Sequence, residues 1–189
     1  MKRSFVVIVS ALIAAASVCS LAGCGSKEAS QAQSAAASAA SSAVAAADAG
    51  NGAFSDTDVV ANIKGVNVEL NTEIEPIVEA LGEPKDVSSQ TTCHGTEGED
   101  KTYTYDGFTI MTYPKDGKDL VLEVNISSAD IASSKGVKVG DPVSAVTAAY
   151  GEPSKKVGVY YSYSTADNKS LQFMVENDVV TEIDYFYTV

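Results

Sequence analysis

The chain has 189 residues, enough for one ordinary domain or two very small ones. Its 13 Lys and Arg residues are outnumbered by 25 Asp and Glu residues, which gives a formal net charge of −12 at pH 7. This balance argues against nucleic-acid binding, which needs clustered basic side chains, and because Arg3 is the only arginine it also argues against an enzyme acting on phosphates.

The N-terminus has the pattern of a targeting segment. Lys2 and Arg3 precede an apolar run over residues 5–18, which is too short to span a bilayer comfortably and has the length of a signal-peptide core. The following Leu-Ala-Gly-Cys sequence at 21–24 resembles the bacterial lipobox. That resemblance implies cleavage before Cys24 and acylation of its thiol, with palmitate among the acyl chains. The alternative is an ordinary secretory signal with an incidental cysteine.

We therefore expect residues 1–23 to be a lipoprotein signal peptide and the mature protein to be anchored in the bilayer through Cys24. Several acyl chains on one residue give stable anchoring, because each buried methylene contributes about 0.8 kcal/mol. The protein would then lie at the cell membrane or envelope, facing outside the cytoplasm.

After loss of Cys19 and lipidation of Cys24, Cys93 has no partner within the chain. It is either a buried strand residue or a thiol that pairs between chains.

Residues 24–54 are predicted to be the lipidated cysteine and a disordered tether. The segment is mostly Ala and Ser and has no aromatic residue before Phe54, so it cannot bury enough apolar surface to offset its ordering entropy. Alanine favours transient helix, but nothing here would hold such a helix against a core. The expected role of the tether is to space the folded part from the lipid surface.

Residues 55–189 contain similar segments in the same order. Residues 64–68 resemble 135–139, and the Ala-Leu-Gly-Glu-Pro sequence at 80–84 resembles Ala-Tyr-Gly-Glu-Pro at 149–153. Such ordered similarity predicts a duplication. We expect one repeat over about 59–128 and a second over about 129–189. Because a unit of this size is marginal alone, the two should pack as one body.

Each repeat is predicted to be a short strand, a helix and then an antiparallel meander. Gly82 ends a first helix capped near Asn71 or Thr72, and Gly151 ends a second helix over about 142–150, capped by Asp141. Alternating apolar residues then predict strands. These strands lie at 101–105, 108–113, 120–126, 157–163, 171–175 and 179–187. The expected fold class is therefore α+β, with two tandem helix-plus-antiparallel-meander repeats.

The segment from Val139-Gly140-Asp141-Pro142-Val143 through Tyr150-Gly151-Glu152-Pro153, followed by a Tyr-rich meander, resembles the tandem-repeat fold of the β-lactamase inhibitor protein. It also resembles the single-unit outer-membrane-assembly lipoproteins of the SmpA/OmlA type. The resemblance implies the same α+β architecture. It transfers no binding residue, and the disulfides of the inhibitor are also absent from this chain.

Few residues could carry catalysis. Cys93 and His94 are neighbours on an extended segment, so their side chains should point to opposite faces and form a poor nucleophile–base pair. Two such ligands cannot complete a structural zinc site. The acidic stretches at 97–100 and 116–119 lack the spacing of a calcium loop and suggest solvated turns. We therefore expect no catalytic residue, no metal and no cofactor.

The tyrosines are the most suggestive binding residues, since all nine lie between Tyr103 and Tyr187. Residues two apart on a strand share one side of a sheet. Two arrangements remain open: an exposed aromatic platform, or rings packed under the helices with their hydroxyls at the rim. The candidate binding residues are Tyr103, Tyr105, Tyr161, Tyr163, Tyr185 and Tyr187.

The function expected from these observations is a membrane-anchored extracytoplasmic lipoprotein carrying a non-catalytic protein-binding or polymer-binding module. The expected partner is another envelope protein or a wall polymer, and the acidity of the chain favours a basic partner. One alternative is a structural component of an envelope-assembly complex, by analogy with the single-unit relatives. Another is an enzyme, which would need a pocket with convergent ionisable groups.

Overall fold

The computed structural model describes residues 52–92 and 97–189. The predicted signal peptide, the lipidation site Cys24, most of the tether, Cys93 and His94 lie outside the described residues. Within the described part, no helix is both long enough and apolar enough to cross a membrane.

The described chain is dominated by β-strands. A 3-10 helix, η1 (Asp56–Val59), leads into a two-stranded hairpin of β1 (Val60–Ile63) and β2 (Val66–Glu69). The two α-helices are α1 (Glu75–Leu81) and α2 (Val143–Tyr150). The other strands are β3 (Asp86–Thr91), β4 (Glu99–Tyr105), β5 (Phe108–Lys115), β6 (Lys118–Ile126), β7 (Lys155–Val157), β8 (Tyr160–Ser164), β9 (Lys169–Glu176) and β10 (Val179–Tyr187).

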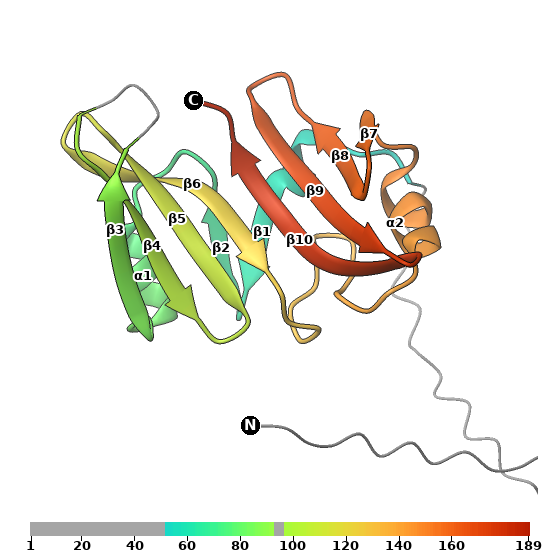
Figure 1. Cartoon of the computed structure of the whole chain (residues 1–189), viewed down its shortest axis with the longest axis horizontal. Coiled ribbons are helices and arrows are strands. Elements are labelled where there is room, and N and C mark those ends of the chain that lie inside the picture. The colour runs from blue at the N-terminus through green and yellow to red at the C-terminus, as the bar shows by residue number, and fades with distance from the viewer. Residues whose placement is uncertain (1–51, 93–96) are drawn as a thin grey trace, which may run out of the picture. The chain divides into compact units, whose positions relative to one another are not determined.

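Eight of these strands form one antiparallel sheet in the order β3-β4-β5-β6-β10-β9-β8-β7 (Figure 1). Within each group of four, strands that are neighbours in the sheet are also consecutive in the chain. The two groups are joined by a pairing between strands far apart in the chain, in which Ile126 lies opposite Ile183 and Asn125 opposite Asp184. We call this β6–β10 contact the seam.

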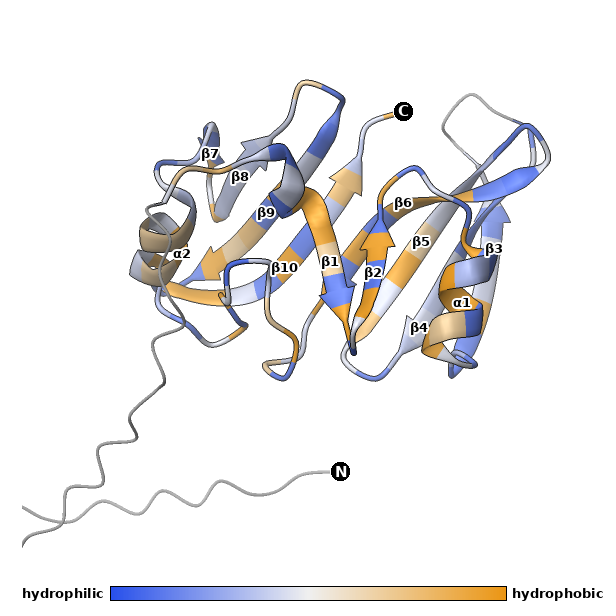
Figure 2. Cartoon of the chain, turned by 180° about the vertical axis from the view of Figure 1, so that it is seen from behind, coloured by the Kyte–Doolittle hydropathy of each residue, from blue (hydrophilic) through white to orange (hydrophobic). Residues whose placement is uncertain are grey.

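Only one face of the sheet is covered by described elements. Seen from behind, the β1–β2 hairpin crosses over β6 and β10, with α1 and α2 to either side (Figure 2). The opposite face, turned toward the viewer in Figure 1, has no described helix or strand in front of it. We call it the open face.

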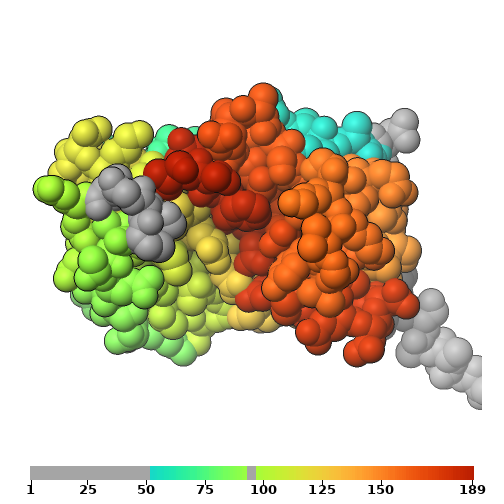
Figure 3. All heavy atoms as spheres, turned by 45° about the horizontal axis from the view of Figure 1, so that its top comes forward, coloured from blue at the N-terminus to red at the C-terminus, as the bar shows by residue number. Residues whose placement is uncertain are grey.

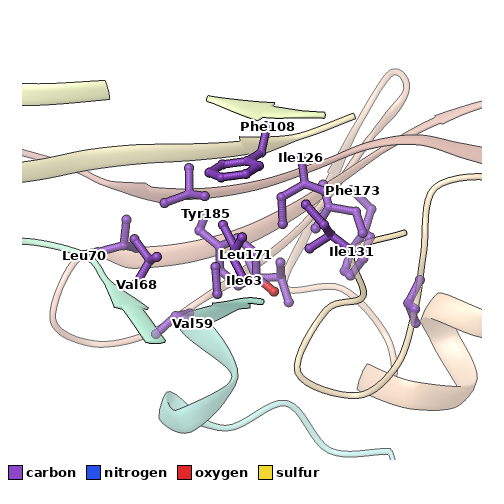
Figure 4. Close-up of a cluster of buried hydrophobic side chains, with 14 of the residues drawn as sticks. Val59, Ile63, Val68, Leu70, Phe108, Ile126, Ile131, Leu171, Phe173 and Tyr185 are labelled. Atoms are coloured by element: carbon purple, nitrogen blue, oxygen red, sulfur yellow. The ribbon is translucent and has the colours of Figure 1, made fainter. Parts of the chain in front are cut away.

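The core lies between the sheet and these covering elements, because alternate strand residues are apolar and point to the same side. In register across the sheet stand Phe108, Ile126, Ile183 and Phe173, none of them more than 2% exposed. Ile63 and Val68 of the hairpin meet this layer from the covered side (Figure 4).

The predicted α+β fold class, with two helix-plus-meander repeats, is wrong. The described chain is mostly β, with two α-helices of seven and eight residues. The seam is the physical reason, because it merges the strands of both predicted units into a single eight-stranded sheet. The helix caps also differ from those predicted. The residues at the two N-cap positions are Ile74 and Pro142. Asp141, the predicted cap of the second helix, instead accepts a hydrogen bond at Oδ2 from the backbone N–H of Lys138.

The N-terminal end of the described chain is clamped onto the covered face near α2. Phe54 packs on the Tyr163 ring at 5.5 Å, and its backbone N–H donates to the carbonyl of Tyr150 at 3.2 Å. Lys135 Nζ lies 3.0 Å from the buried Asp58 Oδ2 and donates to the Ala53 carbonyl at 2.6 Å. We call this set of contacts the N-terminal clamp.

Both helices end at a glycine whose carbonyl binds a tyrosine. Gly82 and Gly151 have φ angles of 87° and 78°, in a region of backbone conformation that residues other than glycine rarely adopt. Tyr105 Oη donates to the Gly82 carbonyl at 3.1 Å, and Tyr163 Oη donates to the Gly151 carbonyl at 2.8 Å. These hydrogen bonds hold both rings on the covered face.

The Tyr163→Phe substitution should reduce the free energy of unfolding by about 1 kcal/mol, because it removes the hydrogen bond to Gly151 while keeping the buried ring. The matched control is Tyr160→Phe on the same strand, where the side chain is 40% exposed and its hydroxyl has no hydrogen bond within the described part. Urea unfolding of both variants measures the difference. Equal stabilities of the two variants would show that the bond contributes nothing.

Candidate functional site

The structure places the six predicted tyrosines on the covered side of the sheet or at its rim. Tyr105, Tyr163 and Tyr185 are core residues, with exposures of 8%, 1% and 0%. Tyr103, Tyr161 and Tyr187 are partly buried and pack against the core. These six rings therefore form no exposed platform, but the expected placing of their hydroxyls at the rim does not hold for Tyr185, whose hydroxyl is buried. Burial also raises the pKa of Tyr163 to about 12, so its hydroxyl stays protonated at neutral pH.

The open face instead carries rows of mainly polar side chains. One row across the sheet contains Thr109, Asn125, Asp184, Gln172 and Ser162. The adjacent row contains Met111, Glu123, Phe186, Ser170 and Ser164. Glu182 lies opposite Met174 in the next row. The central strands thus bring three carboxylates together near the seam.

A shallow pocket of about 300 Å³ lies at the seam. Figure 3 shows the surface here, where the yellow atoms of β6 lie between the green atoms of the first strand group and the red atoms of β10. We call it the seam pocket. Its lining residues are Leu122, Glu123, Gln172, Asp184, Phe186 and Tyr187. The walls thus combine carboxylates with aromatic and aliphatic surface, and one of the predicted tyrosines, Tyr187, is among them.

An asparagine links the carboxylates. Asn125 Nδ2 donates to Asp184 Oδ1 at 2.6 Å and also to Glu182 Oε1. Gln172 Nε2 donates away from the pocket to Ser162 Oγ at 2.7 Å. Across the described ranges, no lysine forms an ion pair with Glu123, Glu182 or Asp184. The negative charge is therefore shared through one neutral amide without a compensating cation.

The pKa of Asp184 is raised to about 7, mainly because the carboxyl is buried and secondly because Glu182 repels its charge. The hydrogen bond from Asn125 offsets part of this rise, and repulsion from Glu123 adds a smaller contribution to it. Burial, followed by repulsion from Glu182, also raises the pKa of Glu123. Desolvation and like charge both disfavour the ionised carboxyl, so Asp184 takes up a proton near neutral pH.

Partly buried carboxylates without a counter-charge can bind a proton or a cation. A metal ion would need several ligand atoms converging on one point. In the part of the chain that the structure describes, no group of three or more His, Cys, Asp or Glu side chains has that arrangement.

Sequence reasoning missed these residues. The outward polar positions of the two strands are visible in Leu-Glu-Val-Asn at 122–125 and Glu-Ile-Asp at 182–184, where polar and apolar residues alternate. Neither segment shows by itself that it pairs with the other, and the cluster exists only because it does.

Comparison with known proteins gives a family for this chain. The profile of a domain of unknown function, DUF7738, matches residues 57–173. The chain belongs to the DUF7738 family. Its DUF7738 region includes Glu123, Asn125 and Gln172 of the site, whereas Glu182 and Asp184 on β10 follow the matched residues.

Two solved structures are similar to this DUF7738 protein. One is the uncharacterized protein yfeY from Escherichia coli, at 17% identity and a TM-score of 0.40, with 63% of this chain and 92% of that chain covered. The other is an extracellular protein containing a SCP domain from Bacillus anthracis, at 10% identity and a TM-score of 0.37, with 62% and 44% covered. Comparison with curated proteins gave no match.

The raised pKa of Asp184 predicts that stability depends on pH. Because the folded state holds this proton more tightly than the unfolded chain, the stabilisation is complete below about pH 4 and is lost as pH rises through about 7. The loss amounts to at most roughly 4 kcal/mol. Asp184→Asn should remove most of this decline, leaving the smaller part due to Glu123, and should be more stable than the wild type at pH 8.

Urea unfolding between about pH 4 and pH 8 measures this effect. The control Glu176→Gln removes an exposed carboxylate from β9, outside the seam pocket, and should follow the wild-type curve. Parallel curves for Asp184→Asn and the wild type would contradict the assignment of the proton to Asp184.

Proposed function

We propose that this protein is an extracytoplasmic lipoprotein, anchored to a membrane through Cys24, whose open face binds a basic protein partner without catalysing a reaction. The lipobox-like segment at 21–24 supports the anchor. The Ala- and Ser-rich segment that follows supports a spacer between lipid and the folded part. The open face supports the binding role.

The observation that carries this proposal is the composition of the open face around the seam. Three carboxylates, on Glu123, Glu182 and Asp184, have no lysine paired with them among the described residues. Apolar side chains lie beside them on the same face, with Phe186 on β10 and Met111 and Met174 on the neighbouring strands β5 and β9. Methionine and aromatic residues are enriched where proteins meet, and complementary charge selects the partner and speeds association.

A basic protein fits this surface better than a wall polymer does. The whole chain carries a net charge of −12, so its field repels anionic polymers and attracts cationic surfaces. Apolar side chains interspersed with carboxylates match a partner that offers both cationic and apolar side chains.

The anchor is tested by Cys24→Ala in the native cell. Without acyl chains the protein should leave the membrane pellet and be recovered in the soluble fraction, because the methylenes that hold it in the bilayer are missing. The matched control is Cys93→Ala, which removes the other cysteine of the expected mature chain and should remain in the membrane. Immunoblotting of the fractions gives the result. A wild-type protein already found in the soluble fraction would refute the anchor.

The binding face is tested by photo-crosslinking from the full chain in cells. A crosslinking amino acid at Met174 on the open face should capture a basic protein, whereas the same residue at the exposed Ala148 of α2, on the covered side, should not. The yield from Met174 should fall when the ionic strength of isolated envelopes is raised from about 0.05 M to about 0.5 M, because salt screens surface charges.

Equal capture from both positions would argue against the open face as the binding surface. Co-sedimentation with purified wall polymer, without a protein adduct from Met174, would replace the proposed protein partner by a polymer.

A further inference from the structure

We propose that the seam pocket binds the guanidinium group of a single arginine side chain presented by the partner. This inference rests on the proposed function and names the chemical group that the open face recognises. Three properties of the pocket lead to it: acceptors without donors, negative charge without a counter-ion, and flat apolar walls.

The pocket contains hydrogen-bond acceptors that lack donors. Asp184 is only 9% exposed and lines the pocket, and its Oδ1 accepts from Asn125 at 2.6 Å. Its Oδ2 receives no hydrogen bond from any described residue. Gln172 is in a similar position, because its amide nitrogen donates to Ser162 and its Oε1 has no described donor. Asp184 Oδ2 and Gln172 Oε1 are therefore acceptors that remain free to bind donor groups of a ligand in the pocket.

The charge of the pocket requires a cationic donor. Glu123 lines the same pocket, and Glu182 shares the Asn125 amide with Asp184. A cation placed among them would relieve the repulsion and form charge-assisted hydrogen bonds, which are about twice as strong as neutral ones. A neutral ligand would satisfy the acceptors but leave the repulsion in place.

The shape of the pocket favours arginine over lysine or a metal ion. Leu122, Phe186 and Tyr187 form apolar and aromatic walls beside the acceptors. A guanidinium is planar, stacks on aromatic rings and is weakly hydrated, so it tolerates such walls better than the strongly hydrated ammonium of lysine. Its fork of N–H donors can also reach two acceptors at once. The volume of about 300 Å³ has room for one long side chain.

The experiment titrates the full chain, in non-ionic detergent, with Nα-acetyl-arginine amide and follows the side-chain amide NMR signals of Asn125 and Gln172. The uncharged isostere Nα-acetyl-citrulline amide and Nα-acetyl-lysine amide are the ligand controls. Arginine should shift both amide signals in a saturable, salt-sensitive way. It should bind at least roughly tenfold more tightly than citrulline, since the citrulline side chain has no charge.

Two pocket variants and one matched control test the location. Asp184→Asn and Glu123→Gln keep the side-chain shapes and should each weaken arginine binding by about tenfold or more. Glu176→Gln removes the same charge from the open face outside the pocket and should leave the affinity unchanged. Thermal unfolding of each variant confirms that it is folded before its affinity is compared.

Equal binding of arginine and citrulline, equal binding of arginine and lysine, or an equal loss in Glu176→Gln would each overturn the arginine pocket. The crosslinking result from Met174 separates the two proposals. If a basic partner is captured but arginine fails to bind the pocket, the inference is wrong and the proposed function stands. If no basic partner is captured either, the proposed function fails as well.

Discussion

The pairing of β6 with β10 is the interaction on which both faces of the sheet depend. It connects two meanders that are separated by α2 and a long connection in the chain. On the covered side it aligns Ile126 with Ile183 in the centre of the core. On the open side the same register sets Asn125 against Asp184. Because side chains alternate between faces, a slip of one residue would exchange core and pocket residues together.

The local structure of this protein was largely readable from its sequence, whereas the long-range pairing was not. Gly82 and Gly151 mark both helix ends, and alternating apolar residues mark the strands of both meanders. A short strand ahead of the first helix was expected and β2 lies there, but its pairing with β1 and the edge strands β3 and β7 were missed, since these segments are short or polar. The prediction of the fold class was wrong because the local sequences of 118–126 and 179–187 do not indicate that these two strands pair with each other.

The tyrosines show that a correctly predicted strand pattern does not determine which face of the sheet its side chains occupy. Period-two spacing places Tyr161 and Tyr163 on one side of β8, but it does not say which side the helices cover. The Tyr163 hydroxyl reaches the Gly151 carbonyl at the end of α2, a contact that sequence spacing does not reveal. Asp184 on the opposite face departs from the usual rule that a buried charge has an opposite charge beside it. Such local conflicts with folding are expected at binding sites.

The N-terminal clamp determines where mechanical load would be applied to the folded part. Phe54 and Asp58 are held by Tyr150, Tyr163 and Lys135, all on the side away from the seam pocket. A pull on the chain ahead of Gly52 would therefore strain the buried Asp58–Lys135 ion pair before it reached β6 or β10. Tension on the N-terminal side and occupancy of the open face act on separate contacts, so a partner could be retained while the chain is stretched.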